Sequence, residues 1–196
     1  MKILHISDTH GFHHQLGDLP DADVIVHSGD FCMIGTQQEA LYFLNWFCDL
    51  PYKYKIFICG NHDECLYNAN IDGLDSNVFY LNNSDVEIEG LKFYGVPLFM
   101  SDSYRRQDIY YKLIPSDIDV LITHSPPLGI LDFDMDRNWG SDVLLDRINE
   151  INPKAHLFGH IHLSHGILKK GHTLYSNAAI MNDNYTNLNS YNLIEI

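Results

Sequence analysis

The sequence predicts a single α/β domain over residues 1–196, in which strands of a mainly parallel sheet alternate with helices. Three observations support this fold class. Five short apolar runs recur along the chain, the segments between them have helical spacing of apolar residues, and a second group of strand-like runs follows. Strand–helix–strand alternation implies right-handed crossovers and parallel pairing. No repeat, low-complexity tract or long linker divides the chain.

The five apolar runs are expected to be strands buried on both faces. They are short, continuous and partly β-branched, which is typical of the covered sheets of α/β proteins. They comprise residues 3–6, 24–26, 56–59, 120–122 and 155–158.

Two helices are expected between these strands. Thr36 and Glu39 have the spacing of a capping box, which predicts a helix start at this point. The helix that follows would bury an apolar face formed by Leu41, Phe43, Leu44, Trp46 and Phe47. A second helix is expected over residues 141–151 and would end before Pro153. Its inward-facing residues would be Val143, Leu144, Leu145 and Ile148.

A second group of strands is expected from period-2 patterns separated by turn residues. Residues 78–81, 86–88 and 91–96 would be joined by turns at 82–84 and 89–90. The segments 166–179 and 191–196 are also strand-like, and Lys170-Gly171 predicts a hairpin turn.

Composition excludes several classes of protein. Apolar residues make up 45% and charged residues 19% of the chain, which is typical of a globular protein and not of a disordered one. The net charge of −14 disfavours a partner such as extended nucleic acid. The four cysteines form no CxxC pair and are interpreted as reduced thiols. Because neither a signal peptide nor a membrane span is evident, we expect a cytoplasmic protein.

Polar residues follow each of the five predicted strands. Because the carboxyl ends of parallel strands meet at one edge of a sheet, these residues are expected to converge there. The segments are Ser7-Asp8-Thr9-His10-Gly11, Gly29-Asp30, Gly60-Asn61-His62-Asp63, His124-Ser125-Pro126-Pro127 and Gly159-His160-Ile161-His162.

The residue types indicate a metal centre. Carboxylate, amide and imidazole groups together suit manganese, iron or zinc better than calcium. Seven side chains are candidate ligands, which is more than one ion takes from protein while keeping a position open for substrate. These are Asp8, His10, Asp30, Asn61, His124, His160 and His162. Two ions that share one carboxylate would use them all.

In their order and spacing, these segments resemble the signature of the calcineurin-like metallophosphoesterases. The stretches around His124 and His160 further resemble a branch of small metallophosphoesterase-domain proteins that includes cyclic nucleotide phosphodiesterases. The resemblance covers residues 7–179 and implies two packed mixed β-sheets flanked by helices, a four-layer αββα sandwich. The two groups of strands predicted above agree with a fold of two sheets.

The resemblance also implies roles for the site residues. One ion would be held by Asp8, His10 and His162, the other by Asn61, His124 and His160, with Asp30 bridging both. His62 would be the catalytic residue, stabilising the transition state and protonating the leaving oxygen. Two divalent ions are expected, manganese first, with iron, zinc or nickel as alternatives. A metal-bridging hydroxide would attack phosphorus in line.

The expected reaction is hydrolysis of a small phosphodiester, with 2′,3′- or 3′,5′-cyclic nucleotides as candidates. A phosphomonoesterase, a nuclease and a non-catalytic scaffold remain alternatives. Gly29-Asp30 lacks the arginine that follows it in the related phosphoprotein phosphatases, which disfavours that activity.

Two interpretations of Asp63 stay open, as a residue that orients His62 or as the start of a helix. The run 132–136 is interpreted as a solvated loop, and Asn177 as a residue near the site.

Overall fold

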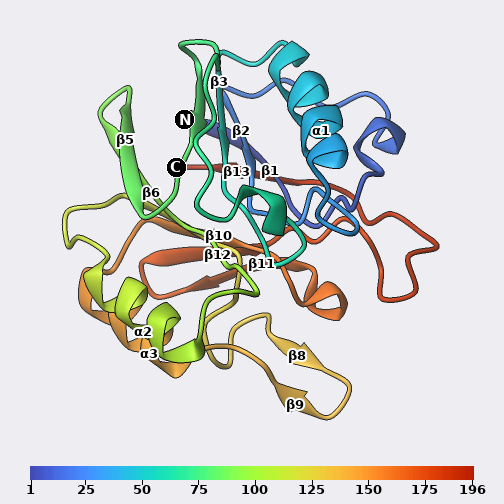
Figure 1. Ribbon diagram of the computed structural model, residues 1–196. Helices are drawn as coiled ribbons and strands as arrows, with labels where there is room; N and C mark the ends of the chain where they lie inside the picture. Colours follow the sequence, from blue (N-terminus) through green and yellow to red (C-terminus); the bar gives the residue numbers. More distant parts are fainter.

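The computed structural model describes residues 1–196 and contains two large mixed β-sheets packed face to face, with helices on both outer faces (Figure 1). This four-layer arrangement confirms the fold class expected from the sequence. One long helix covers the first sheet and two cover the second. None of the helices combines the length and apolar character that crossing a bilayer requires.

The first sheet has the strand order β13-β1-β2-β3-β4. Its four neighbouring strands from β1 to β4 are parallel, and β13 pairs antiparallel with β1 at one side. The bounds are β1 Lys2–Ile6, β2 Val24–His27, β3 Tyr54–Phe57, β4 Val78–Tyr80 and β13 Asn192–Glu195. Three of the five apolar runs thus lie side by side in this sheet.

The second sheet has the order β11-β12-β10-β7-β6-β5 and contains the other two apolar runs as β7 and β10. Its central strands β12, β10, β7 and β6 are parallel, whereas both edge strands pair antiparallel. The bounds are β5 Ser84–Ile88, β6 Leu91–Val96, β7 Val120–Thr123, β10 Ala155–Phe158, β11 Gly166–Lys170 and β12 Thr173–Asn177. The hairpin expected at Lys170-Gly171 joins β11 and β12.

Alternation along the strands creates three apolar layers. Ile3 of β1 points into the core between the two sheets, where it meets residues such as Val120 and Leu157. The neighbouring Leu4 points outward, into the layer beneath the helix α1 (Gln37–Asp49). This opposite burial of adjacent residues explains why the strand runs are continuously apolar.

The two expected helices are present. Thr36 accepts a hydrogen bond from Glu39 N and forms the predicted capping box of α1, although Leu41 is 59% exposed and lies outside the buried face. The helix α3 (Asp142–Ile151) begins after the cap Ser141 and ends at Asn152, whose backbone is left-handed. It buries Leu144 and Ile148 against the second sheet, while Val143 and Leu145 are partly buried.

The helix α2 (Tyr104–Leu113) was not predicted from the sequence. Only Gln107 and Tyr111 of this helix are buried, so the apolar periodicity that indicates an amphipathic helix is weak. It packs beside α3 on the outer face of the second sheet. Its start is marked by Ser103, which accepts a hydrogen bond from Arg106 N.

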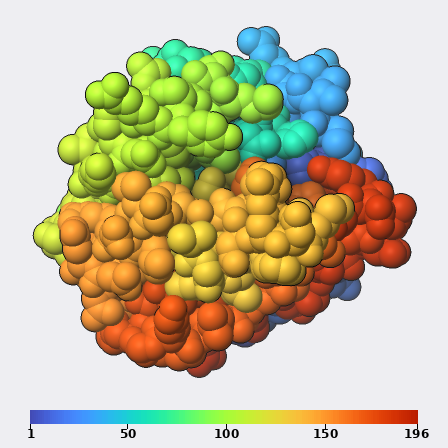
Figure 2. Space-filling model, turned by 90° about the horizontal axis from the view of Figure 1, so that it is seen from below, coloured from blue at the N-terminus to red at the C-terminus, as the bar shows by residue number.

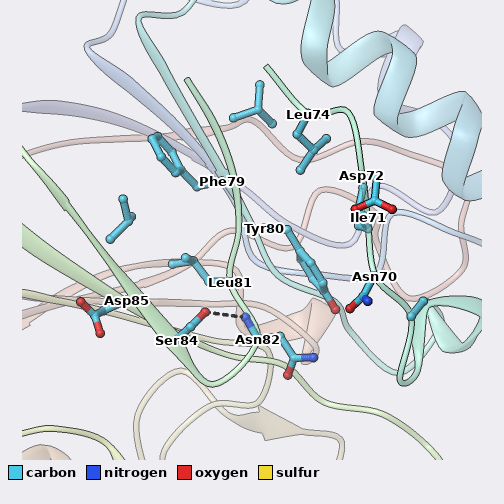
Figure 3. A pocket seen from close by; sticks show the side chains of 13 residues that line it. Asn70, Ile71, Asp72, Leu74, Phe79, Tyr80, Leu81, Asn82, Ser84 and Asp85 are labelled. Carbon is cyan, nitrogen blue, oxygen red and sulfur yellow. Dashed lines mark hydrogen bonds between the residues drawn. The ribbon is translucent and has the colours of Figure 1, made fainter. Parts of the chain in front are cut away.

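The segment expected as a simple turn at 82–84 instead carries the chain from one sheet to the other. β4 is an edge strand of the first sheet and β5 of the second. Leu81 donates its backbone N–H to the carbonyl of Phe57 in the first sheet. Its side chain lies so close to Gly95 of the second sheet that a Cβ at that position would collide with it. A hollow of about 530 Å³ lies beside this crossing (Figure 3).

The interpretation of residues 132–136 as a solvated loop is confirmed for its exposed part, in which Met135 is 83% exposed, but it is wrong for Asp132, which is buried. Two short strands, β8 (Phe133–Asp134) and β9 (Arg137–Asn138), form a hairpin there. Asp132 is only 1% exposed, because its carboxylate accepts hydrogen bonds from Gly129 N, Gly140 N and Asn138 Nδ2. The carboxylate of Asp132 therefore holds the two ends of this segment together.

Candidate metal centre

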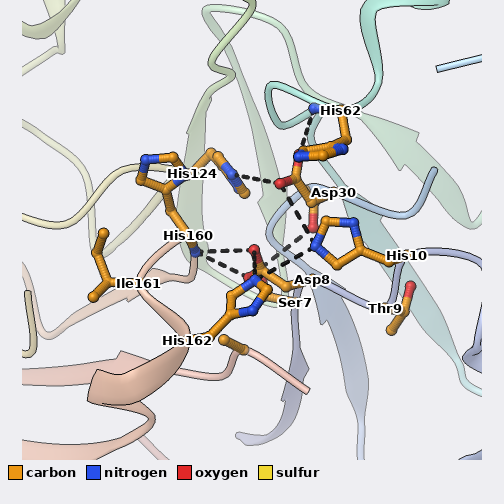
Figure 4. A network of polar contacts seen from close by, with 12 residues as sticks. Ser7, Asp8, Thr9, His10, Asp30, His62, His124, His160, Ile161 and His162 are labelled. Atoms are coloured by element: carbon orange, nitrogen blue, oxygen red, sulfur yellow. Dashed lines mark hydrogen bonds and ion pairs between the residues drawn. The ribbon is translucent and has the colours of Figure 1, made fainter. Parts of the chain in front are cut away.

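All five polar segments meet at one edge shared by the two sheets (Figure 4). The loops after β1, β2 and β3 come from the first sheet, and those after β7 and β10 come from the second. Backbone hydrogen bonds join the loops directly, as from Asp8 N to Gly29 O, from His10 N to Asp30 O and from Gly159 N to His124 O. The convergence expected from the positions of these segments is therefore present.

Four of the seven candidate ligands have left-handed backbones. The φ angles are 52° for Asp8, 43° for His10, 59° for Asp30 and 71° for His160. For residues other than glycine this conformation costs on the order of 1–2 kcal/mol each. Such a concentration of strain, held by the surrounding hydrogen bonds, is typical of a functional site.

One group of candidate ligands consists of Asp8, His10 and His162, whose ligand atoms all lie within 4.8 Å of one another. His162 Nε2 is 3.4 Å from Asp8 Oδ1 and also 3.4 Å from His10 Nε2. Ligand atoms that share an ion at about 2.1 Å stand roughly 3–3.5 Å apart. The spacing of this group therefore fits one ion.

A second group consists of Asp30, His124 and His160, again within 4.8 Å of one another. His124 Nε2 is 3.3 Å from Asp30 Oδ2 and 3.1 Å from Asn61 Oδ1, which adds the amide ligand expected from the sequence. Asp30 Oδ2 is also 3.9 Å from His10 Nε2 of the first group. Asp30 thus lies between the two groups. That all seven residues bind metal stays a prediction.

The charge at this edge also suits cations. Asp8 and Asp30 are 0% and 2% exposed, and their only ion-pair partners are imidazoles. Buried carboxylates are normally paired with a cation or coordinate a metal. A divalent ion in each group would neutralise this charge, so the donor set and its burial fit the expected metal centre.

Backbone carbonyls orient the candidate imidazoles. The Nδ1 of His10 lies 3.1 Å from Cys32 O, and the Nδ1 of His124 lies 2.9 Å from Ser28 O. A carbonyl oxygen only accepts, so each Nδ1 carries a proton, and in the neutral imidazole each Nε2 presents its lone pair to the site. This arrangement is the usual support for metal-binding histidines.

The glycines of the polar segments permit the close approach of these loops. A Cβ on Gly29, whose φ is +103°, would lie 2.6 Å from Gly60 N and 2.7 Å from His124 Nδ1. A Cβ on Gly159 would collide with the carboxylate of Asp8 and the hydroxyl of Ser7. Only glycine fits where the loops cross.

Burial and neighbouring charges shift the pKa values of the site. Burial raises the pKa of Asp8, but the hydrogen bond and charges of His162 and His124 outweigh it, so this pKa lies well below its usual range. Burial lowers the pKa of His124, yet the Asp30 carboxylate outweighs it and raises the pKa to about 10. Burial and His124 lower the pKa of His160 to about 4. A metal ion would therefore displace a proton from His124.

His62 adjoins the centre in a different way. Its Nδ1 donates to Met33 O at 2.6 Å, and its backbone N–H donates to Asp30 Oδ1 at 2.7 Å. Its ring stands edge-on to the His10 ring at 4.7 Å, and its ligand atom lies within 4.8 Å of those of His10 and Asp30. That His62 is a catalytic residue which does not bind metal stays a prediction.

One of the two interpretations of Asp63 is confirmed: Asp63 is the N-cap residue of the short 3₁₀ helix Glu64–Leu66. Its fully buried carboxylate makes no hydrogen bond to the His62 side chain and none that caps this helix. It accepts backbone N–H groups from Asp30, Cys32 and Gly60, each at 2.8 Å, and so joins the loops after β2 and β3. Burial and the charge of Asp30 raise the pKa of Asp63 to about 7.

Asn177 lies next to the site, as the sequence suggested. Its side-chain amide donates to Leu131 O and Ile161 O, and its oxygen accepts from Ala179 N. The contact with Ile161 holds the segment that carries His160 and His162. Asn177 therefore supports the ligands without belonging to either group.

Sequence reasoning missed Tyr185, whose ring lies 5.1 Å from the His10 ring and 5.5 Å from the His162 ring. It belongs to an irregular segment after Asn177 with no recognisable motif. His13 and His14, which lie shortly after the first polar segment, pack against Tyr42 and Trp46 of α1.

Comparisons with known proteins agree with this geometry. The sequence model of the calcineurin-like phosphoesterase family matches residues 1–164. A UPF0046 protein of Caenorhabditis elegans is 37% identical over 205 residues, covering 93% of this chain and 70% of its own. Human metallophosphoesterase domain-containing protein 1 is 33% identical over 231 residues, covering 100% of this chain and 71% of its own. A solved structure with 17% identity has a TM-score of 0.66 and covers 90% of this chain and 89% of its own, which supports the fold alone.

Proposed function

The chain belongs to the calcineurin-like phosphoesterase family, and from this premise we propose that it hydrolyses a small phosphodiester at a centre of two divalent metal ions. Cyclic nucleotides are the substrates that we propose to test first. The observation that carries the proposal is the position of Asp30 between two groups of buried ligands. A carboxylate so placed is what two ions about 3.5–4 Å apart require.

Manganese is the proposed metal, because the donor set mixes carboxylate, amide and imidazole groups and contains no thiolate. Iron, zinc and nickel are the alternatives. Two bound ions would polarise the phosphoryl group and would help to ionise the water that attacks phosphorus in line. Asp8, His10 and His162 would hold one ion, and Asn61, His124 and His160 the other, with Asp30 shared.

His62 is proposed as the general acid. Its Nδ1–H is held by Met33 O, so its Nε2 is the atom free to carry a proton to the leaving oxygen. The same imidazolium would stabilise the charge that develops on the phosphoryl oxygens. Its contact with Asp30 through the backbone keeps the ring beside the centre.

A small substrate is favoured over a polymer. The net charge of −14 opposes the approach of long nucleic acids. We also propose that the protein acts in the cytoplasm.

A substrate panel tests the proposed reaction. Protein loaded with manganese would be assayed with bis-p-nitrophenyl phosphate, p-nitrophenyl phosphate, 2′,3′- and 3′,5′-cyclic nucleotides and single-stranded DNA. We expect turnover of the diesters to exceed that of the monoester and of DNA. Preference for the monoester or for DNA would favour a phosphomonoesterase or a nuclease. Two bound metals with no turnover on any ester would favour a scaffold.

Two variants separate the roles of His62 and Asp30. His62→Ala is expected to keep both metals and to lose turnover by about 10²–10⁴-fold, as for loss of a general acid. Asp30→Asn is expected to lose metal as well as turnover, because the shared carboxylate charge is gone. Metal content by elemental analysis is the measurement. An empty site in His62→Ala would contradict its proposed role.

A further inference from the structure

An aromatic side chain from the C-terminal segment stands beside the candidate centre. The Tyr185 ring lies 5.1 Å from the His10 ring and 5.5 Å from the His162 ring, at an interplanar angle of 69° to each. We propose that Tyr185 is a substrate-binding residue, whose phenol hydroxyl donates a hydrogen bond to a non-bridging oxygen of the phosphoryl group. This inference rests on the proposed function of the site.

The tyrosine hydroxyl is available as a donor. Tyr185 is 39% exposed, and its surroundings contain charged groups but no hydrogen-bond partner for the hydroxyl. A phenol hydroxyl donates one hydrogen bond. An anionic phosphoryl oxygen is a strong acceptor for such a donor.

The backbone is built to hold the ring in this place. Tyr185 has a φ of 53°, a left-handed conformation that is unfavourable for an aromatic residue. Asn182 stabilises it, since its carbonyl accepts from Tyr185 N and its side-chain oxygen accepts from Thr186 N and Asn187 N. Residues held in a strained backbone by surrounding hydrogen bonds often serve function.

The same segment is anchored to the loop that carries the ligands. Met181 N donates to Asp8 O, and Ile180 N donates to Ser7 O. These two bonds hold the start of the segment that carries Tyr185 beside the loop that carries Asp8. Figure 2 shows the red C-terminal loop beside the yellow-orange segment that contains the β8–β9 hairpin.

Most of the arginines are engaged elsewhere, which leaves neutral donors to bind the phosphoryl oxygens. Arg106 is held by Asp102 and Tyr67, Arg137 stacks on Trp139, and Arg147 donates to Ile114 O. The fourth, Arg105, is exposed on α2. The phenol of Tyr185, by contrast, belongs to a ring that lies against two candidate ligands, His10 and His162.

The test compares Tyr185→Phe with wild-type protein, both loaded with manganese. We expect the KM for bis-p-nitrophenyl phosphate and the inhibition constant of inorganic phosphate to rise together by about 10- to 100-fold, as for loss of a hydrogen bond to a charged group. Metal content should not change. Tyr42→Phe, which removes a matched hydroxyl on α1, should leave all three quantities unchanged.

Tyr185→Gly guards against a defect in folding. Glycine adopts positive φ freely, so this variant should be at least as stable as the wild type while showing the same loss of phosphate affinity. Values within twofold of the wild type in Tyr185→Phe would overturn the inference, as would a loss of metal in that variant. If wild-type protein hydrolyses no ester, the proposed function fails. Calorimetric binding of inorganic phosphate to both metal-loaded proteins then still decides the role of Tyr185.

Discussion

At the scale of single residues, the carboxylate of Asp63 shows how one buried side chain can hold a site together. It accepts three backbone N–H groups from loops that follow two different strands. One of these groups belongs to Asp30, the residue between the two candidate ligand groups. Asp63 therefore sets the position of Asp30 through the backbone.

Replacing Asp63 by alanine would leave three buried N–H groups without an acceptor. Each unsatisfied group costs roughly 1–3 kcal/mol, so we expect Asp63→Ala to lower the free energy of unfolding by about 3 kcal/mol or more. Metal occupancy should fall too, because Asp30 loses its support. Urea unfolding and elemental analysis measure the two effects. Asp72→Ala, in an exposed loop, is the control and should change stability by no more than about 0.5 kcal/mol.

At the scale of elements, the start of α1 does more than begin a helix. The Glu39 carboxylate accepts the backbone N–H groups of Met33, Ile34 and Thr36. The carbonyl of Met33 in turn accepts from His62 Nδ1. The helix cap thus fixes the short segment that orients the proposed general acid.

Variants of the capping box should separate its role in starting α1 from its role in orienting His62. Thr36→Ala is expected to cost about 1 kcal/mol of stability, the usual effect of losing an N-cap. Glu39→Ala should cost more and should also reduce kcat while metal content is kept, because the Met33 carbonyl is no longer held. Chemical unfolding and steady-state kinetics would be compared with Gln38→Ala, an exposed neighbour. Equal kcat values in all three variants would contradict the link to His62.

At the scale of the whole molecule, the centre joins the two sheets. Asp8, Asp30 and Asn61 follow strands of the first sheet, whereas His124 and His160 follow strands of the second. Metal bound by both sets would connect the sheets at one edge, where the interface otherwise consists of polar loops.

Bound metal should consequently stabilise the fold. A ligand at 1,000 times its Kd that binds only the folded state adds about 4 kcal/mol. We expect manganese to raise Tm and chelation to lower it, as measured by calorimetry. The same addition to Asp30→Asn should have a much smaller effect. An unchanged Tm in wild-type protein that demonstrably holds two ions would show that the sheets do not depend on them.

A second property of the whole molecule is its set of buried, uncharged histidines behind the centre. His5 bonds Ser176 and Ser28, and His156 bonds Thr123. Burial is the main cause that lowers the pKa of each to about 3, with a smaller effect of neighbouring histidines. Both rings stay neutral in the folded protein well below the pH at which they would protonate in the unfolded chain.

Stability should therefore fall as the solution is acidified. Below about pH 6.5 the unfolded chain takes up protons that the folded state excludes, so unfolding is favoured progressively down to about pH 3. In that window, each such histidine lowers the free energy of unfolding by about 1.4 kcal/mol for each unit by which the pH falls. Above the window it has no effect on the pH dependence of stability. In His156→Leu, measured without metal, the slope between pH 6 and 4 should decrease by about this amount. An identical slope would contradict the assigned pKa.

The sequence by itself determined the features that depend on neighbours along the chain. Apolar runs, the Thr36–Glu39 cap and the stop before Pro153 are local signals, so five strands and two helices were predicted within a few residues. The seven candidate ligands were predicted to converge for a related reason. Each lies in a loop that directly follows a strand, and parallel strands deliver their carboxyl ends to one edge.

Only the tertiary structure decided what depends on contacts between distant segments. β4 and β5 belong to different sheets because β4 pairs with β3 and β5 pairs with β6. The roles of Asp63 and Asp132 depend on backbone N–H groups that fold toward them. Tyr185 contacts His10 although the two residues lie near opposite ends of the sequence. Sequence spacing carries no record of such approaches, because burial and hydrogen bonding between remote segments are settled only when the chain is packed.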